Sequence, residues 1–271
     1  LARALSQLAG LRSLLSGLPP ALSGRLAAHG FALPVRGLLP PPRGLASRIT
    51  GLYAAIVIYV LILSYGIRIA VGVGEEKATR VVEVLLAAVR PVQLLAGKVI
   101  GMGALAIAQV AAMVATALIL AAAVGSTLLQ GASTGIVVVG AIWFVLGYAF
   151  YCSAFAAAGS LITRQADSYN ATLPLQVPLI LSYLVSFSTA FGNVNVLARV
   201  LAFLPPTAPI SMTMLYAAGA APLWEVAVSA AITAAATVGM AKVAALVYER
   251  AILRTGRRVK VREVIGSRAA V

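Results

Sequence analysis

Apolar residues in this chain are grouped into five long blocks that are separated by shorter polar stretches. The blocks occupy residues 51–73, 97–124, 135–162, 173–191 and 223–248. Each is about as long as the roughly 20 apolar residues with which a helix crosses a hydrocarbon core about 30 Å thick. The pattern therefore predicts an all-α integral membrane protein, whose five transmembrane helices form a domain of residues 49–249.

The distribution of positive charge predicts how these helices are oriented. Lysine and arginine close to the ends of spans are retained in the cytoplasm. The tail at 250–271 carries seven basic residues and one acidic residue, which predicts a cytoplasmic C-terminus in the cell membrane. Because five is an odd number, residues 1–48 are then expected outside, although they hold six arginines and no acid. We interpret them as an extracellular remnant or a juxtamembrane segment, for which the charge rule weakens.

The composition excludes several classes of protein. Of the residues, 61% are hydrophobic and 10% charged, whereas a soluble domain is about one quarter charged. The net charge of +14 could indicate nucleic acid, but the basic residues lie between and after the apolar blocks, where lipid headgroups attract them. One cysteine and one histidine allow no intrachain disulfide and argue against a metal site. The expected partners therefore include membrane lipid and exclude nucleic acid.

The segment at 75–90, after the first span, has the pattern of an amphipathic helix. Glu76, Arg80, Glu83 and Arg90 fall on one helical face, with apolar residues on the other. Such a helix can lie in the headgroup layer as a connector, or its alternating charges can dock a cytoplasmic protein. Periodicity alone favours the connector.

Two strings of residues are similar to a known family. The string GEEKATRVVEVLLAAVRPVQLLAGKVIG (74–101) resembles the cytoplasmic loop of ABC-2 type permeases, particularly the branch with sodium-efflux permeases. The string FLPPTAPISM (203–212) resembles the extracellular segment before that family's last span. Members have six spans, with an extracellular domain between the first two. The resemblance thus implies that this sequence lacks the first span and most of that domain.

The resemblance also implies a function and partners. The chain would be the permease subunit of an ABC exporter, paired with a second permease protomer in a homodimer or heterodimer. ATP and Mg²⁺ would be bound by a separate cytoplasmic ATPase subunit, and no cofactor or metal by this chain. The residues expected to couple the ATPase to the spans are Glu75, Glu76, Arg80, Glu83, Arg90, Arg164 and Asp167.

The segment between the last two spans contains Pro205, Pro206 and Pro209, which forbid one continuous helix. Irregular backbone at membrane depth is tolerated only where protein or a water-filled cavity covers it. The segment is therefore either a re-entrant outer gate or a plain surface loop, and the resemblance favours the gate.

Polar residues within the spans are candidates for a transport pathway, because burying them in lipid costs free energy. These candidates are Gln109, Asn170, Gln176 and Glu225. Two alternatives to the permease stay open: a membrane-embedded enzyme acting on lipids or peptides, and an ion-coupled carrier. The sequence does not identify the substrate, for which sodium, a drug-like molecule, a lipid and a peptide are all compatible.

Overall fold

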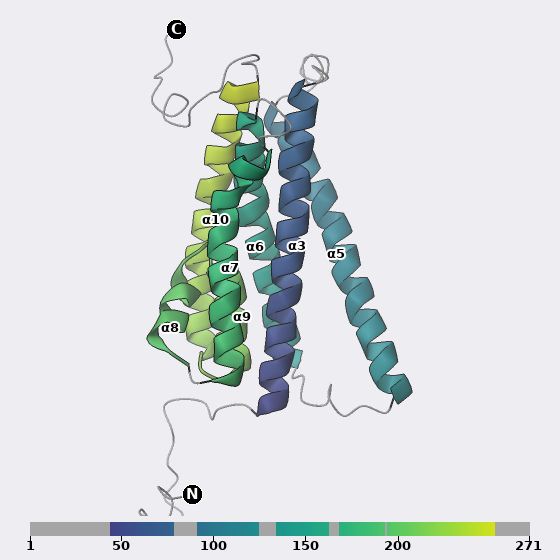
Figure 1. The fold of residues 1–271 in the computed structure, drawn as a ribbon, viewed down its shortest axis with the longest axis vertical. Coiled ribbons are helices and arrows are strands. Elements are labelled where there is room, and N and C mark those ends of the chain that lie inside the picture. The colour runs from purple at the N-terminus through teal and green to yellow at the C-terminus, as the bar shows by residue number, and fades with distance from the viewer. Residues whose placement is uncertain (1–43, 79–90, 125–133, 163–167, 193, 253–271) are drawn as a thin grey trace, which may run out of the picture. The chain divides into compact units, whose positions relative to one another are not determined.

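The computed structural model describes residues 44–78, 91–124, 134–162, 168–192 and 194–252. In this part of the chain every regular element is a helix, which confirms the all-α prediction (Figure 1). The helices are α3 (Leu45–Ala78), α5 (Pro91–Val124), α6 (Thr134–Leu161), α7 (Ser168–Phe191), α8 (Val196–Phe203), α9 (Ala208–Ala217) and α10 (Leu223–Ile252).

Five of these described helices are long and apolar enough to cross a membrane: α3, α5, α6, α7 and α10. They coincide with the five predicted spans, but most of them extend beyond the apolar blocks. Helix α7 begins at Ser168 rather than at 173, because its polar first turn can be helical without being apolar. Helix α5 begins at Pro91, since a proline in the first position of a helix needs no N–H donor.

The predicted start of a separate helix at 75 is wrong. Helix α3 continues without a break through Glu75 and Glu76 to Ala78. Glu76 forms an ion pair with Lys98 of α5. A basic residue of a neighbouring helix, rather than the N-terminus of a helix beginning at 75, therefore stabilises this acid. Residues 79–90, which hold the rest of the predicted amphipathic helix, lie outside the described residues.

The five long helices run antiparallel in chain order (Figure 1). Helices α3, α6 and α10 begin at the end of the bundle where α7 ends. We call it the hairpin end, because the hairpin of α8 and α9 lies there. Helix α10 finishes at the opposite end, so the first and last of the described helices carry the chain from one end of the bundle to the other. This is the consequence expected of an odd number of spans.

Helices α3 and α6 form the most extensive interhelix contact, and glycines allow their close approach. A Cβ atom on Gly66 would meet the ring of Phe155. A Cβ atom on Gly159 would lie 2.5 Å from the carbonyl oxygen of Ala70. Small residues at such crossings let backbones pack closely within a membrane, where van der Waals contact is a main source of helix association.

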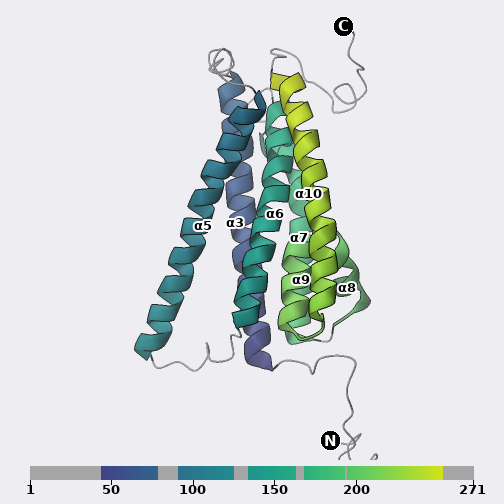
Figure 2. The same cartoon turned by 180° about the vertical axis from the view of Figure 1, so that it is seen from behind.

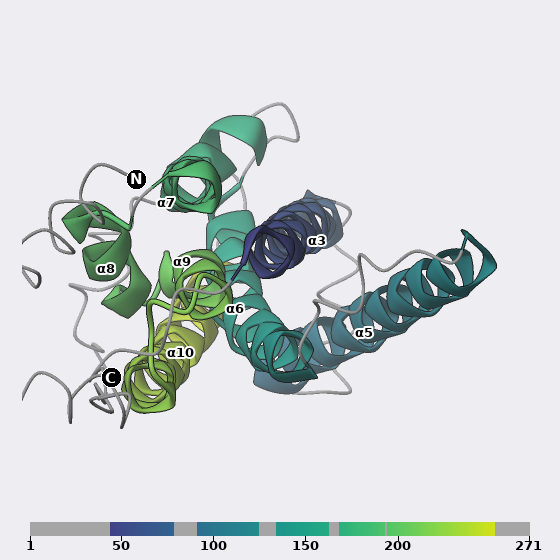
Figure 3. The same cartoon turned by 90° about the horizontal axis from the view of Figure 1, so that it is seen from below.

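Among the α5 residues whose side chains are described, those that pack against the core of the bundle lie between Leu94 and Val110. Leu95 and Ala106 are buried, whereas the side chains at 111–116 are all exposed. From behind and from below, the second half of α5 diverges from the other helices (Figures 2 and 3).

Candidate functional site

Helices α8 and α9 form a hairpin that enters the bundle from the hairpin end. All ten residues of α9 are buried. Its last residue, Ala217, contacts Gly51 in the second turn of α3, whereas Pro209 lies beside Ile62, near the middle of the same helix. The chain therefore passes into the bundle along α8 and returns along α9. The surface-loop alternative is wrong, since α9 is enclosed by α3, α6, α7 and α8.

The sequence explains where the two short helices begin and end. The side chain of Asn195 caps α8 by accepting a hydrogen bond from the N–H of Ala198 at 2.8 Å. Pro205 and Pro206 end α8, because they have no N–H to donate and disfavour helical backbone in the residue before them. Pro209 lies in the first turn of α9, where N–H groups have no helical partner in any case.

The two adjacent prolines leave two carbonyl groups of α8 without their usual partners, since each proline stands four residues after one of them. The hydroxyl of Thr207 donates to the Leu201 carbonyl at 2.5 Å. The hydroxyl of Ser229, on α10, donates to the Ala202 carbonyl at 2.5 Å. Both carbonyls are thus paired within the apolar bundle, where an unpaired one would be costly.

Hydroxyls from two further helices bind the tip of the hairpin. Tyr151 of α6 donates to the Pro206 carbonyl at 2.5 Å, and Ser182 of α7 donates to the Thr207 carbonyl at 2.8 Å. The hydroxyls of Ser182 and Ser211 are also 2.8 Å apart. Side chains of α6, α7 and α10 therefore hold an irregular turn inside the bundle, which is the condition for such backbone at membrane depth.

The turn between α9 and α10 closes the hairpin. Gly219 has a φ of 72°, a left-handed conformation that glycine adopts without steric cost. The N–H of Gly219 donates to the Tyr216 carbonyl and the N–H of Ala220 to the Leu215 carbonyl, both at 3.0 Å. This pattern is the Schellman motif, which pairs the last carbonyls of a helix.

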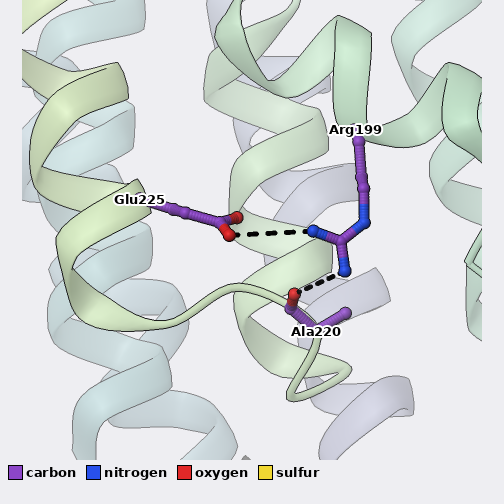
Figure 4. Close-up of polar contacts among 3 residues, drawn as sticks. All are labelled: Arg199, Ala220 and Glu225. Atoms are coloured by element: carbon purple, nitrogen blue, oxygen red, sulfur yellow. Dashed lines mark hydrogen bonds and ion pairs between the residues drawn. The ribbon is translucent and has the colours of Figure 1, made fainter. Parts of the chain in front are cut away.

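A charged contact joins α8 to this turn and to α10 (Figure 4). The guanidinium of Arg199 donates to the Ala220 carbonyl at 3.3 Å and lies 3.7 Å from a carboxylate oxygen of Glu225. Glu225 is in the first turn of α10, where the helix dipole stabilises an acid. The Arg199 side chain is 42% exposed and the Glu225 side chain 12%, so water screens the pair mainly from the arginine side. We call Arg199, Glu225 and the Ala220 carbonyl the outer clamp.

The structure does not gather the predicted pathway residues into one site. Glu225 is engaged in the outer clamp. Gln109 on α5 is exposed and accepts a hydrogen bond from the Tyr65 hydroxyl at 2.8 Å. Gln176 on α7 is buried and donates to Thr172 of its own helix at 3.3 Å. The side chain of Asn170 lies outside the described residues.

The predicted coupling residues are described only in part. Glu75 is exposed near the end of α3, and Glu76 lies 2.7 Å from the Lys98 amine. The remaining predicted residues fall outside the described part of the chain: Arg80, Glu83, Arg90, Arg164 and Asp167.

Sequence reasoning missed the hydroxyl groups that bind the hairpin. Tyr151, Ser182 and Ser229 lie in apolar blocks, where a serine hydroxyl often bonds to its own helix and a tyrosine hydroxyl can reach a neighbouring one. The sequence indicates such residues only indirectly. Prolines within an apolar segment leave carbonyl groups without helical partners, and these carbonyl groups require hydrogen-bond donors from other spans.

Comparison with known proteins identifies the family. The profile of the ABC-2 family transporter protein matches residues 41–246, a range that includes α3 and most of α10. The chain is 27% identical over 210 residues to the uncharacterized protein YhaP of Bacillus subtilis, a match that covers 74% of this chain and 50% of that protein. It is also 27% identical over 175 residues to the uncharacterized protein MJ1024 of Methanocaldococcus jannaschii, covering 65% of this chain and 42% of that protein.

The chain thus spans about half the length of the curated relatives that it matches. No solved structure matches it. The family match nevertheless extends across the bundle, including the re-entrant hairpin and its outer clamp. This chain therefore belongs to the ABC-2 family of transporter proteins.

Proposed function

We propose that this chain is the membrane-spanning permease subunit of an ABC-type exporter. A separate cytoplasmic ATPase subunit binds ATP and Mg²⁺, and this chain converts the ATPase's movement into opening of a pathway. The observation that carries the proposal is the match to the ABC-2 family across residues 41–246, on a bundle with five helices suited to spanning a membrane.

In this proposal the protein acts with a second permease protomer, and the pathway is a cavity between the spans. The seven basic residues of the tail at 250–271 support a cytoplasmic end of α10, because lysine and arginine near span ends are retained in the cytoplasm. In this orientation the hairpin end is outside. Residues 75–90 receive the movement of the ATPase. Closure of the ATPase on ATP favours one of two conformations of the bundle, as any ligand does when it binds one state more tightly.

The re-entrant hairpin is the outer gate. Pro205, Pro206 and Pro209 separate its two helices, so α8 can move without bending a continuous helix. The tip is held by individual hydrogen bonds to α6, α7 and α10. The base is held by the outer clamp, in which the Arg199 side chain is 42% exposed and the Glu225 side chain 12%. These are separate polar contacts, which can break and re-form during a transport cycle.

Co-purification tests the proposed function. The tagged chain is co-expressed with a candidate ABC ATPase subunit from the same genome, and the complex is purified in detergent. We expect a complex of fixed stoichiometry, whose uptake of radioactive sodium or a cationic dye into inverted vesicles stops when the ATPase's P-loop lysine is replaced. Uptake driven by the chain alone under an ion gradient would instead support an ion-coupled carrier, and the permease proposal would be rejected.

Charge exchange at the outer clamp tests the gate. Arg199→Glu places two acids together, and Glu225→Arg places two bases together. We expect each single variant to raise ATP-independent leakage of the transported ion or dye a few-fold, since like charges repel across the base of the hairpin. The double exchange restores an attractive pair and serves as the matched control. Equal leakage in the wild type and both single variants would exclude the clamp from gating.

A further inference from the structure

An ion pair joins α3 to α5 at the end of the bundle opposite the hairpin. A carboxylate oxygen of Glu76 lies 2.7 Å from the amine of Lys98, and the side chains are 28% and 18% exposed. The contact is therefore short and largely shielded from water. A charge that loses its partner at such a site remains poorly solvated, which is strongly unfavourable.

The Glu76–Lys98 pair joins the two helices on either side of residues 79–90. Glu76 is two residues before the end of α3 at Ala78, and α5 begins at Pro91. Lys98 is about two turns into α5. The pair thus links the helix that leads into residues 79–90 with the helix that leads out of them.

The sequence of α3 accommodates the lysine. A Cβ atom at Gly72 would lie 3.3 Å from the Lys98 amine, so the absence of a side chain at 72 leaves room for the lysine against α3. Gly72 is one turn before Glu76 and shares its helical face. The lysine therefore lies along α3 on its way to the carboxylate, rather than extending to the headgroups.

Two further hydrogen bonds hold α5 to the bundle, at Val99 and at Gln109. The Tyr148 hydroxyl of α6 donates to the Val99 carbonyl at 3.0 Å, and the Tyr65 hydroxyl of α3 donates to Gln109 at 2.8 Å. Together with the ion pair, they occupy the part of α5 that precedes the exposed side chains at 111–116. Helix α5 is thus coupled to α3 and α6, and of these three polar contacts Glu76–Lys98 lies nearest to residues 79–90 in the sequence.

We propose that Glu76 and Lys98 form a staple that makes α3 and α5 respond as one unit to the movement of the ATPase. Glu76 is then a positioning residue that acts through Lys98, and not a residue that contacts the ATPase. The effect of the staple on transport rests on the proposed function. The coupling of α3 to α5 does not, because it is a property of this chain alone.

Charge exchange distinguishes the staple from a docking contact. Glu76→Lys and Lys98→Glu each create a like-charged pair, and the double variant restores an attractive pair in reverse order. We expect each single variant to lower ATP-dependent transport roughly tenfold, within the range seen for changes that alter coupling between sites. ATPase co-purification stays at the wild-type level, and the double variant recovers transport. Glu249→Lys, an exposed acid near the end of α10, is the matched control for Glu76→Lys.

A spin-label distance measurement tests the staple independently of transport. Cysteines replace Val60 on α3 and Ile100 on α5, whose side chains are exposed. The chain's one native cysteine, Cys152, is buried and should not take up label. We expect the distance distribution to broaden or shift in either single variant of the staple and to return in the double variant.

The outcomes separate the two proposals. If Glu76→Lys loses the ATPase and the double variant does not regain it, Glu76 is a docking contact and the staple is rejected. If both single variants keep the wild-type distance and transport, the staple is also rejected. If the wild-type chain binds no ATPase, the proposed function fails, but the distance measurement still decides whether the pair couples α3 to α5.

Discussion

Replacement of Gly147 by alanine is expected to disturb the hairpin from a neighbouring helix. Gly147 is buried on α6, opposite the first turn of α9. The new Cβ would lie 2.7 Å from Cβ and 2.8 Å from Cγ of Pro209, and 2.9 Å from Cδ1 of Ile62. Carbon atoms in contact prefer about 3.5–4.0 Å, so the neighbours must retreat by about 1 Å. Ile62 can change rotamer, but the proline ring cannot rotate away.

The size of the effect follows from two opposing contributions. Overpacking a close-packed core costs about 1–3 kcal/mol, and the rigid proline places this site near the upper value. Alanine is favoured over glycine in a helix by about 1 kcal/mol. The net loss in the free energy of unfolding should be about 2 kcal/mol, roughly a thirtyfold change in the equilibrium.

Gly140→Ala is the matched control on the same helix. Its Cβ would lie 3.7 Å from Cβ of Ala54 and 3.9 Å from Cγ2 of Thr213, which are ordinary contacts. This variant should therefore be neutral or more stable by up to about 1 kcal/mol, since only the helix preference changes.

Unfolding in mixed micelles of increasing SDS content measures both variants. Trp143 is fully buried and Trp224 is 64% exposed, so Trp224→Phe leaves a fluorescence signal from the buried ring. We expect Gly147→Ala to unfold at a lower SDS fraction than the parent, and Gly140→Ala at the same or a higher one. Equal stability of the two alanine variants would refute the placement of α9 against α6.

Two further predictions concern the hairpin and the orientation of the chain. Tyr151→Phe removes the donor to the carbonyl at the hairpin tip and should destabilise the protein by about 1–3 kcal/mol in the same assay. The control Tyr53→Phe changes a side chain that is 67% exposed and should leave the stability unchanged. Equal effects of the two variants would argue against the hydrogen bond at the tip. In intact cells, a cysteine at Gly192 should react with an impermeant thiol reagent and one at Ala87 should not, because positive charge retains the loop inside; the reverse labelling would invert the proposed topology.

The transmembrane helices were predictable because apolar length is a local property of the sequence. The five apolar blocks correspond to α3, α5, α6, α7 and α10. Helix ends were less predictable, since polar first and last turns can be helical without being apolar. The prolines at 205, 206 and 209 correctly predicted a broken segment. The burial of α9 was not predictable, because an apolar composition suits both a buried helix and a lipid-exposed one.

The contacts of the site depend on residues far apart in the sequence. Helical spacing places Glu76 and Arg80 on one face of a helix, whereas the structure pairs Glu76 with Lys98 on α5. The sequence makes Glu225 a pathway candidate, whereas the structure pairs it with Arg199. Similarly, Arg48 donates to the Gly192 carbonyl at 2.9 Å, which gives one arginine of the predicted outer segment a structural role. No local pattern encodes these partners, because the fold decides which helix faces meet.

The length of α9 has a consequence for the electrical properties of the pathway. Its ten residues cover about 15 Å, half of a hydrocarbon core about 30 Å thick. In the proposed gate, α9 seals the pathway and water fills the rest of it, so the membrane potential falls mainly across α9. Moving one charge through the full potential changes its energy by about 2.3 kcal/mol per 100 mV. For an ionic substrate, the voltage dependence of transport would therefore be concentrated in the step that passes the hairpin.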